Sequence, residues 1–388
     1  MDRSTDTALD SDLPTSGASD AVDLAARAGA LLTVDLDAIR ANYRLLRAQA
    51  GGALVAGIMK ADAYGLGMAR IAPVLAEEGC RVFFTAHLDE AIRLRPLVPA
   101  DRAIYVLHGA MPGTAADFIA HGISPVLNDA GQAREWITAG RRLGRRLPAA
   151  IQVDTGMSRM GMSPADLALL GDPAGWMGGI EPAFLMSHLA CADEADHPMN
   201  AAQLARFEAL RARFPGLPCS LANSSGLFLG SAFHYDIVRP GAALYGINPR
   251  PGSANPMRAV AALQARIVQV RDVEDGTVVG YGARFRADGP RRIATIAIGY
   301  ADGWLRALTN RGYAFVDGVR VPIAGTVSMD SITLDVSAIP RERIAPGLAV
   351  ELLGPHQHVD EVAAQAGTIG YEVLTRLSGR FHRVYANA

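Results

Sequence analysis

The stretch ALVAGIMKADAYGLG, residues 53–67, is an apolar run that ends on a lysine, Lys60, and then breaks into a short loop of small residues around Tyr64. Its length and apolar content predict a buried strand over residues 53–60. A charged ammonium group is costly to bury, so a lysine at the end of such a strand is either a surface charge or a chemically active group. The rest of the chain decides between these two interpretations.

Further apolar runs, many of them rich in β-branched residues, follow at intervals that leave room for a helix between them. Together with residues 53–60, eight strands are predicted in this part of the chain. The other predicted strands cover residues 82–86, 103–109, 124–129, 149–155, 183–190, 218–225 and 242–247.

The segments between these runs, such as residues 68–79 and 201–214, carry the i, i+3, i+4 apolar spacing of helices that pack on a sheet. Eight strands with helical crossovers favour a closed parallel barrel over an open sheet. We therefore predict a (β/α)8 TIM-type barrel, in the α/β class, over residues 31–255.

The pattern changes after the Pro- and Gly-rich segment 246–256, which we interpret as a domain boundary. Strand-like runs joined by tight turns follow, with an Asp-Gly pair at a hairpin position in residues 315–321 and a short helix near residues 360–367. These features predict a mainly β C-terminal domain over residues 256–388. The acidic, Ser-rich residues 1–30 predict a disordered N-terminal tail that lacks the apolar core of a signal peptide.

Composition excludes several classes of function. With 388 residues, half of them hydrophobic, and a formal net charge of -2, the chain can bury a large core and has no basic surface for nucleic acid. We found no uncharged apolar run long enough to span a membrane. The three cysteines and nine histidines are scattered, so we expect no metal site and a reducing compartment, the cytoplasm.

Polar residues gather at the ends of the predicted strands. Lys60 ends the first, Arg159 follows the fifth, His188 lies inside the sixth, Ser224 lies at the seventh and Arg239 precedes the eighth. Each of these alone is weak evidence. The carboxyl ends of barrel strands meet at one mouth, however, so we expect these side chains to share a site.

A lysine in apolar surroundings can lose its proton and form a Schiff base with a carbonyl group. The small and hydroxyl residues of NSSG (223–226) and RPGAALYG (239–246) lie where such barrels bind phosphate through backbone N–H groups. A lysine that faces a phosphate site predicts either pyridoxal 5'-phosphate or an aldolase that binds a sugar phosphate.

A series of motifs then resembles one family. The chain from residue 30 onward resembles the bacterial alanine racemases, the pyridoxal-phosphate enzymes of fold type III. The motifs that carry the resemblance, in family order and at family-like spacing, are KADAYGLG (60–67), DTGMSRMG (154–161), SHLA (187–190), ANSSG (222–226), VRPGAALYG (238–246), VGYGARF (279–285), IGYADGW (298–304), SMDS (328–331) and IGYE (369–372).

The resemblance implies a two-base interconversion of L- and D-alanine. Lys60 would hold the cofactor and serve one face of the substrate, while Tyr281 would serve the other face. His188 and Arg239 would form a network that assists Tyr281, and Arg239 would also face the pyridine nitrogen of the cofactor, where a cation weakens the electron sink. In the family the two bases that correspond to Lys60 and Tyr281 meet only across a head-to-tail homodimer, so shared active sites are expected.

The resemblance also implies the ligands of the cofactor and the substrate. The expected phosphate ligands are Tyr64, Ser224, Gly241, Ala242 and Tyr371. Arg159 and Met329 would bind the substrate carboxylate, with Arg159 alternatively on the cofactor's phenolic oxygen. Tyr300 and Asp330 would narrow the entrance.

Two positions depart from the family pattern, and one of them is Ser328, which stands where some relatives carry cysteine. Gln152 stands where many relatives have a carbamylated lysine that orients the arginine, so here we expect an amide hydrogen bond to hold Arg159.

Three alternatives stay open at this stage. The first is a racemase of another small amino acid such as serine, because a pocket that admits a methyl group cannot strongly reject an added hydroxyl. The second is a non-enzymatic carrier of pyridoxal phosphate, which would have no use for Tyr281. The third is a Schiff-base aldolase, which would leave the motifs after residue 278 unexplained.

Overall fold

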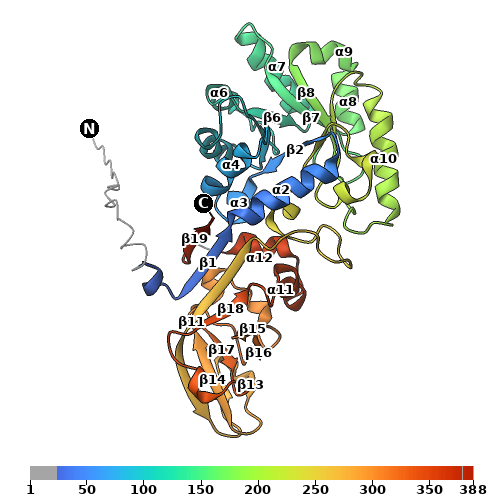
Figure 1. Ribbon diagram of the computed structural model, residues 1–388. Coiled ribbons are helices and arrows are strands. Elements are labelled where there is room, and N and C mark those ends of the chain that lie inside the picture. The colour runs from blue at the N-terminus through green and yellow to red at the C-terminus, as the bar shows by residue number, and fades with distance from the viewer. Residues whose placement is uncertain (1–23, 378, 388) are drawn as a thin grey trace, which may run out of the picture.

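The structure is a computed structural model that describes residues 24–377 and 379–387. Figure 1 shows two parts, a helix-covered barrel and a β domain, with the first and last described strands in the β domain. Most of the predicted tail, residues 1–23, lies outside the described residues. Residues 24–27 are helical and Ala30 begins a strand, so the predicted disorder does not extend to residue 30.

The barrel is a curved sheet of parallel strands in sequence order. Its strands, among the described residues, are β3 (Gly57–Ile58), β4 (Val82–Thr85), β5 (Ala103–Val106), β6 (Ser124–Leu127), β7 (Pro148–Gln152), β8 (Glu181–Met186) and β9 (Cys219–Ser220). The predicted strands for this part of the chain are thereby confirmed, and the observed ones are shorter.

The eighth strand is not the predicted one. Residues 242–247 were expected to form it, but Ala242–Tyr245 is a 3₁₀ turn, η5. The strand is instead β10 (Ile237–Val238), which pairs in parallel with β2 (Leu54–Val55), the beginning of the strand that continues as β3. Backbone bonds from Asp236 N to Cys219 O (3.0 Å) and from Arg239 N to Ala222 O (2.9 Å) join β10 to β9 and close the barrel.

Helices and 3₁₀ turns connect the strands of the described residues, and most of the helices cover the barrel (Figure 1). The helices, with two that belong to the second domain, are α2 (Leu36–Ala50), α3 (Lys60–Tyr64), α4 (Met68–Glu77), α5 (Leu88–Leu94), α6 (Ala115–Ala120), α7 (Ala130–Arg142), α8 (Pro164–Leu170), α9 (Pro173–Trp176), α10 (Pro198–Arg211), α11 (Val359–Ala366) and α12 (Gly370–Arg376). The 3₁₀ turns are η1 (Arg95–Leu97), η2 (Met177–Gly179), η3 (Gly226–Phe228), η4 (Ser231–Phe233), η5 (Ala242–Tyr245), η6 (Tyr281–Ala283), η7 (Tyr300–Asp302), η8 (Arg306–Leu308) and η9 (Arg341–Arg343). No described helix is long and apolar enough to cross a membrane.

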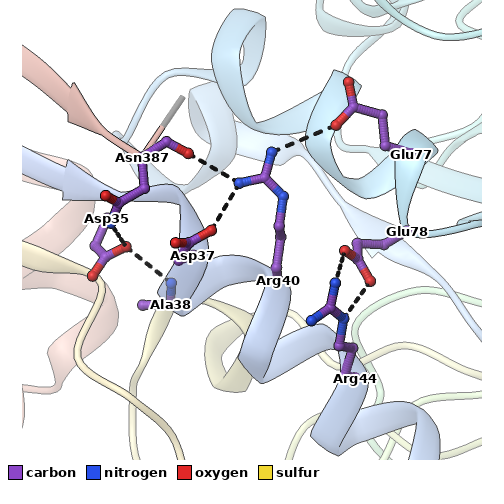
Figure 2. Close-up of polar contacts among 8 residues, drawn as sticks. All are labelled: Asp35, Asp37, Ala38, Arg40, Arg44, Glu77, Glu78 and Asn387. Atoms are coloured by element: carbon purple, nitrogen blue, oxygen red, sulfur yellow. Dashed lines mark hydrogen bonds and ion pairs between the residues drawn. The ribbon is translucent and has the colours of Figure 1, made fainter.

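Helix α2 shows how sequence sets these elements. It begins after Asp35, whose side chain accepts a hydrogen bond from Ala38 N at 3.0 Å. Its outer face carries arginines that bind acidic residues at the end of α4, and Figure 2 shows Arg44 paired with Glu78 at 2.6 Å and Arg40 reaching Glu77 at 3.5 Å. Its inner face is apolar and buried against the barrel.

The second domain is built on a twisted sheet in the order β16-β15-β18-β11-β1-β19, with β14 beside β11 and β17 beside β14. Its strands are β1 (Ala30–Asp35), β11 (Ala261–Val273), β14 (Arg291–Ile296), β15 (Tyr313–Val316), β16 (Val319–Pro322), β17 (Ile332–Asp335), β18 (Ala349–Leu353) and β19 (His382–Ala386), and a separate hairpin pairs β12 (Val278–Val279) with β13 (Phe285–Arg286).

Strand β1 corrects the predicted domain limits. Residues 31–35 were expected in the barrel, but β1 lies between β11, to which it is antiparallel, and β19, to which it is parallel. Alternating burial along β1 marks a strand, but it does not reveal which sheet the strand joins. The β domain therefore contains both ends of the described chain, as Figure 1 shows.

Candidate functional site

A cavity of about 340 Å³ opens at the carboxyl ends of the barrel strands. It brings together predicted residues from strands far apart in sequence, together with one from α12 of the second domain. The predicted residues that line it are Lys60, Tyr64, Gln152, Arg159, His188, Ser224, Arg239, Gly241, Ala242 and Tyr371. A larger hollow of about 980 Å³ lies at the opposite, amino ends of the strands beside α2 and contains no lysine.

Lys60 stands where the first strand gives way to a helical turn, two residues after β3 ends. Its ammonium nitrogen lies 5.8 Å from the centre of the Tyr64 ring. Burial lowers the pKa of Lys60, the positive charge of Arg159 lowers it further, and the carboxylate of Glu90 opposes both. Lys60 is also the only lysine in the 388-residue chain, a signal visible in the sequence that strengthens its assignment.

The turn that follows Lys60 is left-handed. Ala61, Asp62, Ala63 and Tyr64 have φ values of 53, 53, 56 and 56 degrees, and none of them is glycine. Such a conformation costs an L-residue roughly 1–2 kcal/mol, so four in a row need support from their surroundings. Part of that support comes from Glu90, which accepts a hydrogen bond from Ala61 N at 2.6 Å, and from Asp62, which accepts one from Met68 N at 2.8 Å.

The left-handed turn places the Tyr64 ring inside a cluster of tyrosines. The ring centre of Tyr64 lies 4.7 Å from that of Tyr245 and 6.2 Å from that of Tyr371. Burial raises the pKa of Tyr64 and the nearby Tyr371 raises it further, so the hydroxyl keeps its proton at neutral pH. It is therefore available as a hydrogen-bond donor.

Tyr64 faces an anion cradle formed by η5 and its preceding residue. A Cβ atom added at Gly241 would lie 2.3 Å from the Tyr64 hydroxyl oxygen, so only glycine leaves this space open. Ser224 Oγ lies beside the cradle and accepts a hydrogen bond from Ala243 N at 3.1 Å. Within the described residues, neither Gly241 N nor Ala242 N makes a hydrogen bond. Free backbone amides beside two hydroxyls suit a phosphate group.

Arg239, which is buried, and His188, which is half-buried, lie in contact on the wall of the cavity. The Arg239 side chain, in a residue only 4% exposed, donates to Ser187 O at 2.6 Å and to Ser220 Oγ, and its Nη2 lies 3.2 Å from His188 Nδ1. Burial lowers the pKa of Arg239 to about 9, which leaves it a cation at neutral pH. Burial lowers the pKa of His188 well below its usual value, and the charges of Arg239, Arg159 and Lys60 lower it further, so His188 is neutral and accepts from Arg239.

Gln152 and Arg159 both line the cavity, but they are not joined as predicted. The sequence predicted an amide hydrogen bond from Gln152 to Arg159, and among the described residues no such bond is formed. Gln152 is buried at the end of β7, whereas Arg159 lies in an exposed loop after that strand. Within the single chain, Gln152 therefore does not hold Arg159 in place.

Four predicted residues lie outside the cavity, on the β domain. Tyr281 is 75% exposed in η6, and Tyr300, Met329 and Asp330 lie on neighbouring loops. Backbone bonds from Tyr300 N to Ser328 O and from Ala301 N to Met329 O, each 3.0 Å, hold these loops together. Asp330 pairs with Arg380 at 2.8 Å. The single chain thus gathers this group on a surface away from Lys60.

Sequence reasoning missed His108 and Glu90. His108 lines the cavity at the end of the third barrel strand, where its ring packs edge-on against His87 with centroids 4.6 Å apart. Burial lowers the pKa of His108, as do the neighbouring His87, Lys60 and Arg159, while Glu90 opposes this. The strand-end position that singled out Lys60 would have identified His108 as well.

Comparison with known families assigns both parts of the chain. The family model described as alanine racemase, N-terminal domain, matches residues 34–249, and the one described as alanine racemase, C-terminal domain, matches residues 260–385.

Similar curated proteins extend over nearly the whole chain. The catabolic alanine racemase of Mesorhizobium japonicum is 54% identical over 93% of this chain and 94% of its own length. The alanine racemase of Brucella abortus is 47% identical over 92% of this chain and 94% of its own length.

Solved structures show the same architecture. Alanine racemase from Bartonella henselae, with covalently bound pyridoxal phosphate, superposes with a TM-score of 0.89 at 40% identity, over 92% of this chain and 99% of that one. The biosynthetic alanine racemase from Pseudomonas aeruginosa superposes with a TM-score of 0.85 at 35% identity, over 93% of this chain and 100% of that one.

Proposed function

We propose that this chain, which belongs to the alanine racemase family, is an isomerase that interconverts L- and D-alanine with pyridoxal 5'-phosphate as its cofactor. The observation that carries the proposal is the placement of the only lysine, Lys60, in one cavity with the anion cradle at Gly241 and with the hydroxyls of Tyr64 and Ser224. A carbonyl-reactive amine and a phosphate site are the two features that this cofactor requires.

The residues of the cavity fit the cofactor. The hydroxyls of Tyr64, Ser224 and Tyr371 and the amides of Gly241 and Ala242 would bind its phosphate, and Lys60 would hold it covalently. Arg239, a cation buried on the wall, would face its ring nitrogen, and His188 keeps Arg239 in place through Nδ1. When bound, pyridoxal phosphate makes the Cα proton of an attached amino acid acidic.

Two bases are needed to move that proton between the faces of Cα. Lys60 takes or returns it on one face, and the lowered pKa of its amine makes the neutral base available nearer to physiological pH. Tyr281 serves the other face. Arg159 and Met329 bind the substrate carboxylate, Tyr300 and Asp330 narrow the entrance, and Gln152 lines the wall beside Arg159.

Tyr281 lies exposed on the β domain and does not line the cavity that holds the Lys60 of its own chain. We infer a head-to-tail homodimer in which Tyr281, Tyr300 and Met329 of each subunit complete the cavity of the other. This arrangement gives the exposed aromatic and apolar side chains of these loops a function. A cytoplasmic location is also proposed, supported by the three cysteines, which are free among the described residues.

A racemisation assay tests the proposed function. Purified protein loaded with pyridoxal phosphate is incubated with L-alanine, D-alanine or L-serine, and the enantiomers are separated by chiral chromatography. We expect alanine to racemise fastest and Lys60→Ala to lose about 10²–10⁴-fold or more of the rate, because a positioned base is removed. Faster turnover of serine would identify the enzyme as a serine racemase, and no racemisation of either amino acid would refute the proposal.

A further inference from the structure

Glu90 lies directly behind the loop that carries Lys60, although it does not line the cavity. It belongs to the first turn of α5 and is only 8% exposed. Its Oε1 accepts a hydrogen bond from Ala61 N at 2.6 Å, and its Oε2 accepts bonds from Ala86 N at 2.9 Å and His87 N at 3.1 Å. One buried carboxylate thus accepts hydrogen bonds from three backbone amides.

These three amides come from two segments that are distant in sequence. Ala86 and His87 lie between β4 and α5, whereas Ala61 is the first left-handed residue after Lys60. The bond to His87 N caps α5 and would serve a purely structural purpose. The bond to Ala61 N does not contribute to the cap. It fixes the beginning of a strained turn whose two ends carry Lys60 and Tyr64.

Glu90 also affects the charge at Lys60. The groups that face the Lys60 ammonium are Arg159, His108, His188 and the ring of Tyr64. Burial lowers the pKa of Lys60, Arg159 lowers it further, and Glu90 raises it. Removal of the Glu90 charge should therefore lower that pKa further.

We propose that Glu90 is a positioning residue, which holds the left-handed turn so that Lys60 and Tyr64 point into the cavity and which places a negative charge behind the lysine. The proposal rests on the proposed function, because positioning has a purpose only if Lys60 holds the cofactor. Glu90 itself does not touch the cofactor or the substrate.

The chain offers a matched control for this role. Asp166 caps α8 in the same manner, with bonds from Ser163 N at 3.0 Å and from Ala130 N of a distant segment at 3.2 Å, and it does not line the cavity. Asp166→Asn therefore removes an equivalent cap elsewhere. Glu90→Gln removes the charge with little change in size, and Glu90→Asp keeps the charge but shortens its reach.

The first measurement uses the single lysine. Each protein, free of cofactor and shown to be folded by circular dichroism, is labelled with acetic anhydride across a pH series, and acetylation of Lys60 is followed by mass spectrometry. We expect the midpoint of Lys60 reactivity to move to lower pH in Glu90→Gln and to stay near the wild-type value in Glu90→Asp and Asp166→Asn. An unmoved midpoint in Glu90→Gln overturns the electrostatic part of the proposal.

The second measurement is a titration with pyridoxal phosphate followed by absorbance. Both Glu90 variants should bind it at least about tenfold more weakly than wild type, because a charge-assisted hydrogen bond to the turn is lost or strained, while Asp166→Asn should stay within about twofold. Wild-type affinity in Glu90→Asp, or equal losses in Glu90→Gln and Asp166→Asn, overturns the positioning role. Should Glu90→Gln not fold, Glu90→Asp decides this point. If wild type takes up no cofactor, the proposed function fails, and the labelling series still tests Glu90.

Discussion

Lys60 is the one lysine among 37 lysine and arginine residues, so the titration of its amine can be isolated by one substitution. Its pKa is lowered from 10.5, chiefly by burial. Between the lowered value and 10.5 the unfolded chain binds more protons than the folded one, so folded cofactor-free protein gains stability as the pH rises through this window. Below the window, the buried charge is a net cost.

Lys60→Met removes this dependence while keeping a side chain of similar volume. We expect the urea midpoint of wild type, measured against that of Lys60→Met, to increase from pH 7 to pH 10. Because both proteins contain the same tyrosines and cysteines, the shared titrations largely cancel in this comparison. A difference that is equal at both pH values would mean that the amine is as well solvated as in the unfolded chain.

Single residues show how far the sequence predicts the site. Lys60, His188 and Arg239 were found because polar residues at strand ends are expected to converge, and they do. The predicted roles of Tyr281, Tyr300, Met329 and Asp330 follow only from the resemblance, and none of the four lines the cavity that holds Lys60. Glu90 gave no signal, because a glutamate in the first turn of a helix is an ordinary cap unless its distant partner, Ala61 N, is known.

At the scale of elements, an Ala-to-Gly substitution in the left-handed turn α3 should stabilise the protein. In an ordinary helix the same substitution destabilises it. Ala61 is exposed with φ of 53 degrees, so Ala61→Gly should stabilise the protein by about 0.5–1 kcal/mol through relief of strain, less the added freedom of the unfolded chain. Ala48 is exposed inside the regular helix α2, and Ala48→Gly should destabilise it by about 1 kcal/mol.

Thermal or urea unfolding of both variants measures the two effects. Destabilisation of similar size in both would contradict the left-handed conformation. The same two variants also distinguish an effect on stability from an effect on activity. Ala48 does not line the cavity, whereas the backbone N–H of Ala61 donates a hydrogen bond to Glu90 in the turn after Lys60.

Elements were predictable where their apolar run was long enough. The strand after residue 180 and the long strand after residue 260 both appear near the expected places. The strand predicted over residues 242–247 was wrong, because an apolar run does not distinguish a strand from a buried 3₁₀ turn. Here the turn ends at Gly246, which has a φ of 85 degrees. Strand β10 was missed because its two apolar residues, between Asp236 and Arg239, are too short a signal.

At the scale of the whole molecule, the proposed dimer can be tested by complementation. Lys60→Ala and Tyr281→Phe each disable every site of their own homodimer. In a hybrid dimer with shared sites, one site contains both substitutions and the other contains neither. If subunits exchange freely in an equal mixture, half of the dimers are hybrids, so activity should recover to about a quarter of the wild-type value.

The experiment mixes the two variants and measures racemisation before and after subunit exchange. Each variant measured alone at the same total concentration controls for residual activity. Activity that does not rise on mixing, with exchange verified by mass, would mean that each active site is completed within one chain.

The placement of β1 between β11 and β19 has a consequence for biosynthesis. The first described strand, β1, waits for partners that begin at Ala261 and His382, after the described barrel strands have been translated. The barrel has all its strands by Val238 and can close while synthesis continues, but the β sheet is completed only after β19, residues 382–386, has been made. Strand β1 therefore stays unpaired for most of the synthesis of the described residues, and β19 is the strand that joins the sheet last.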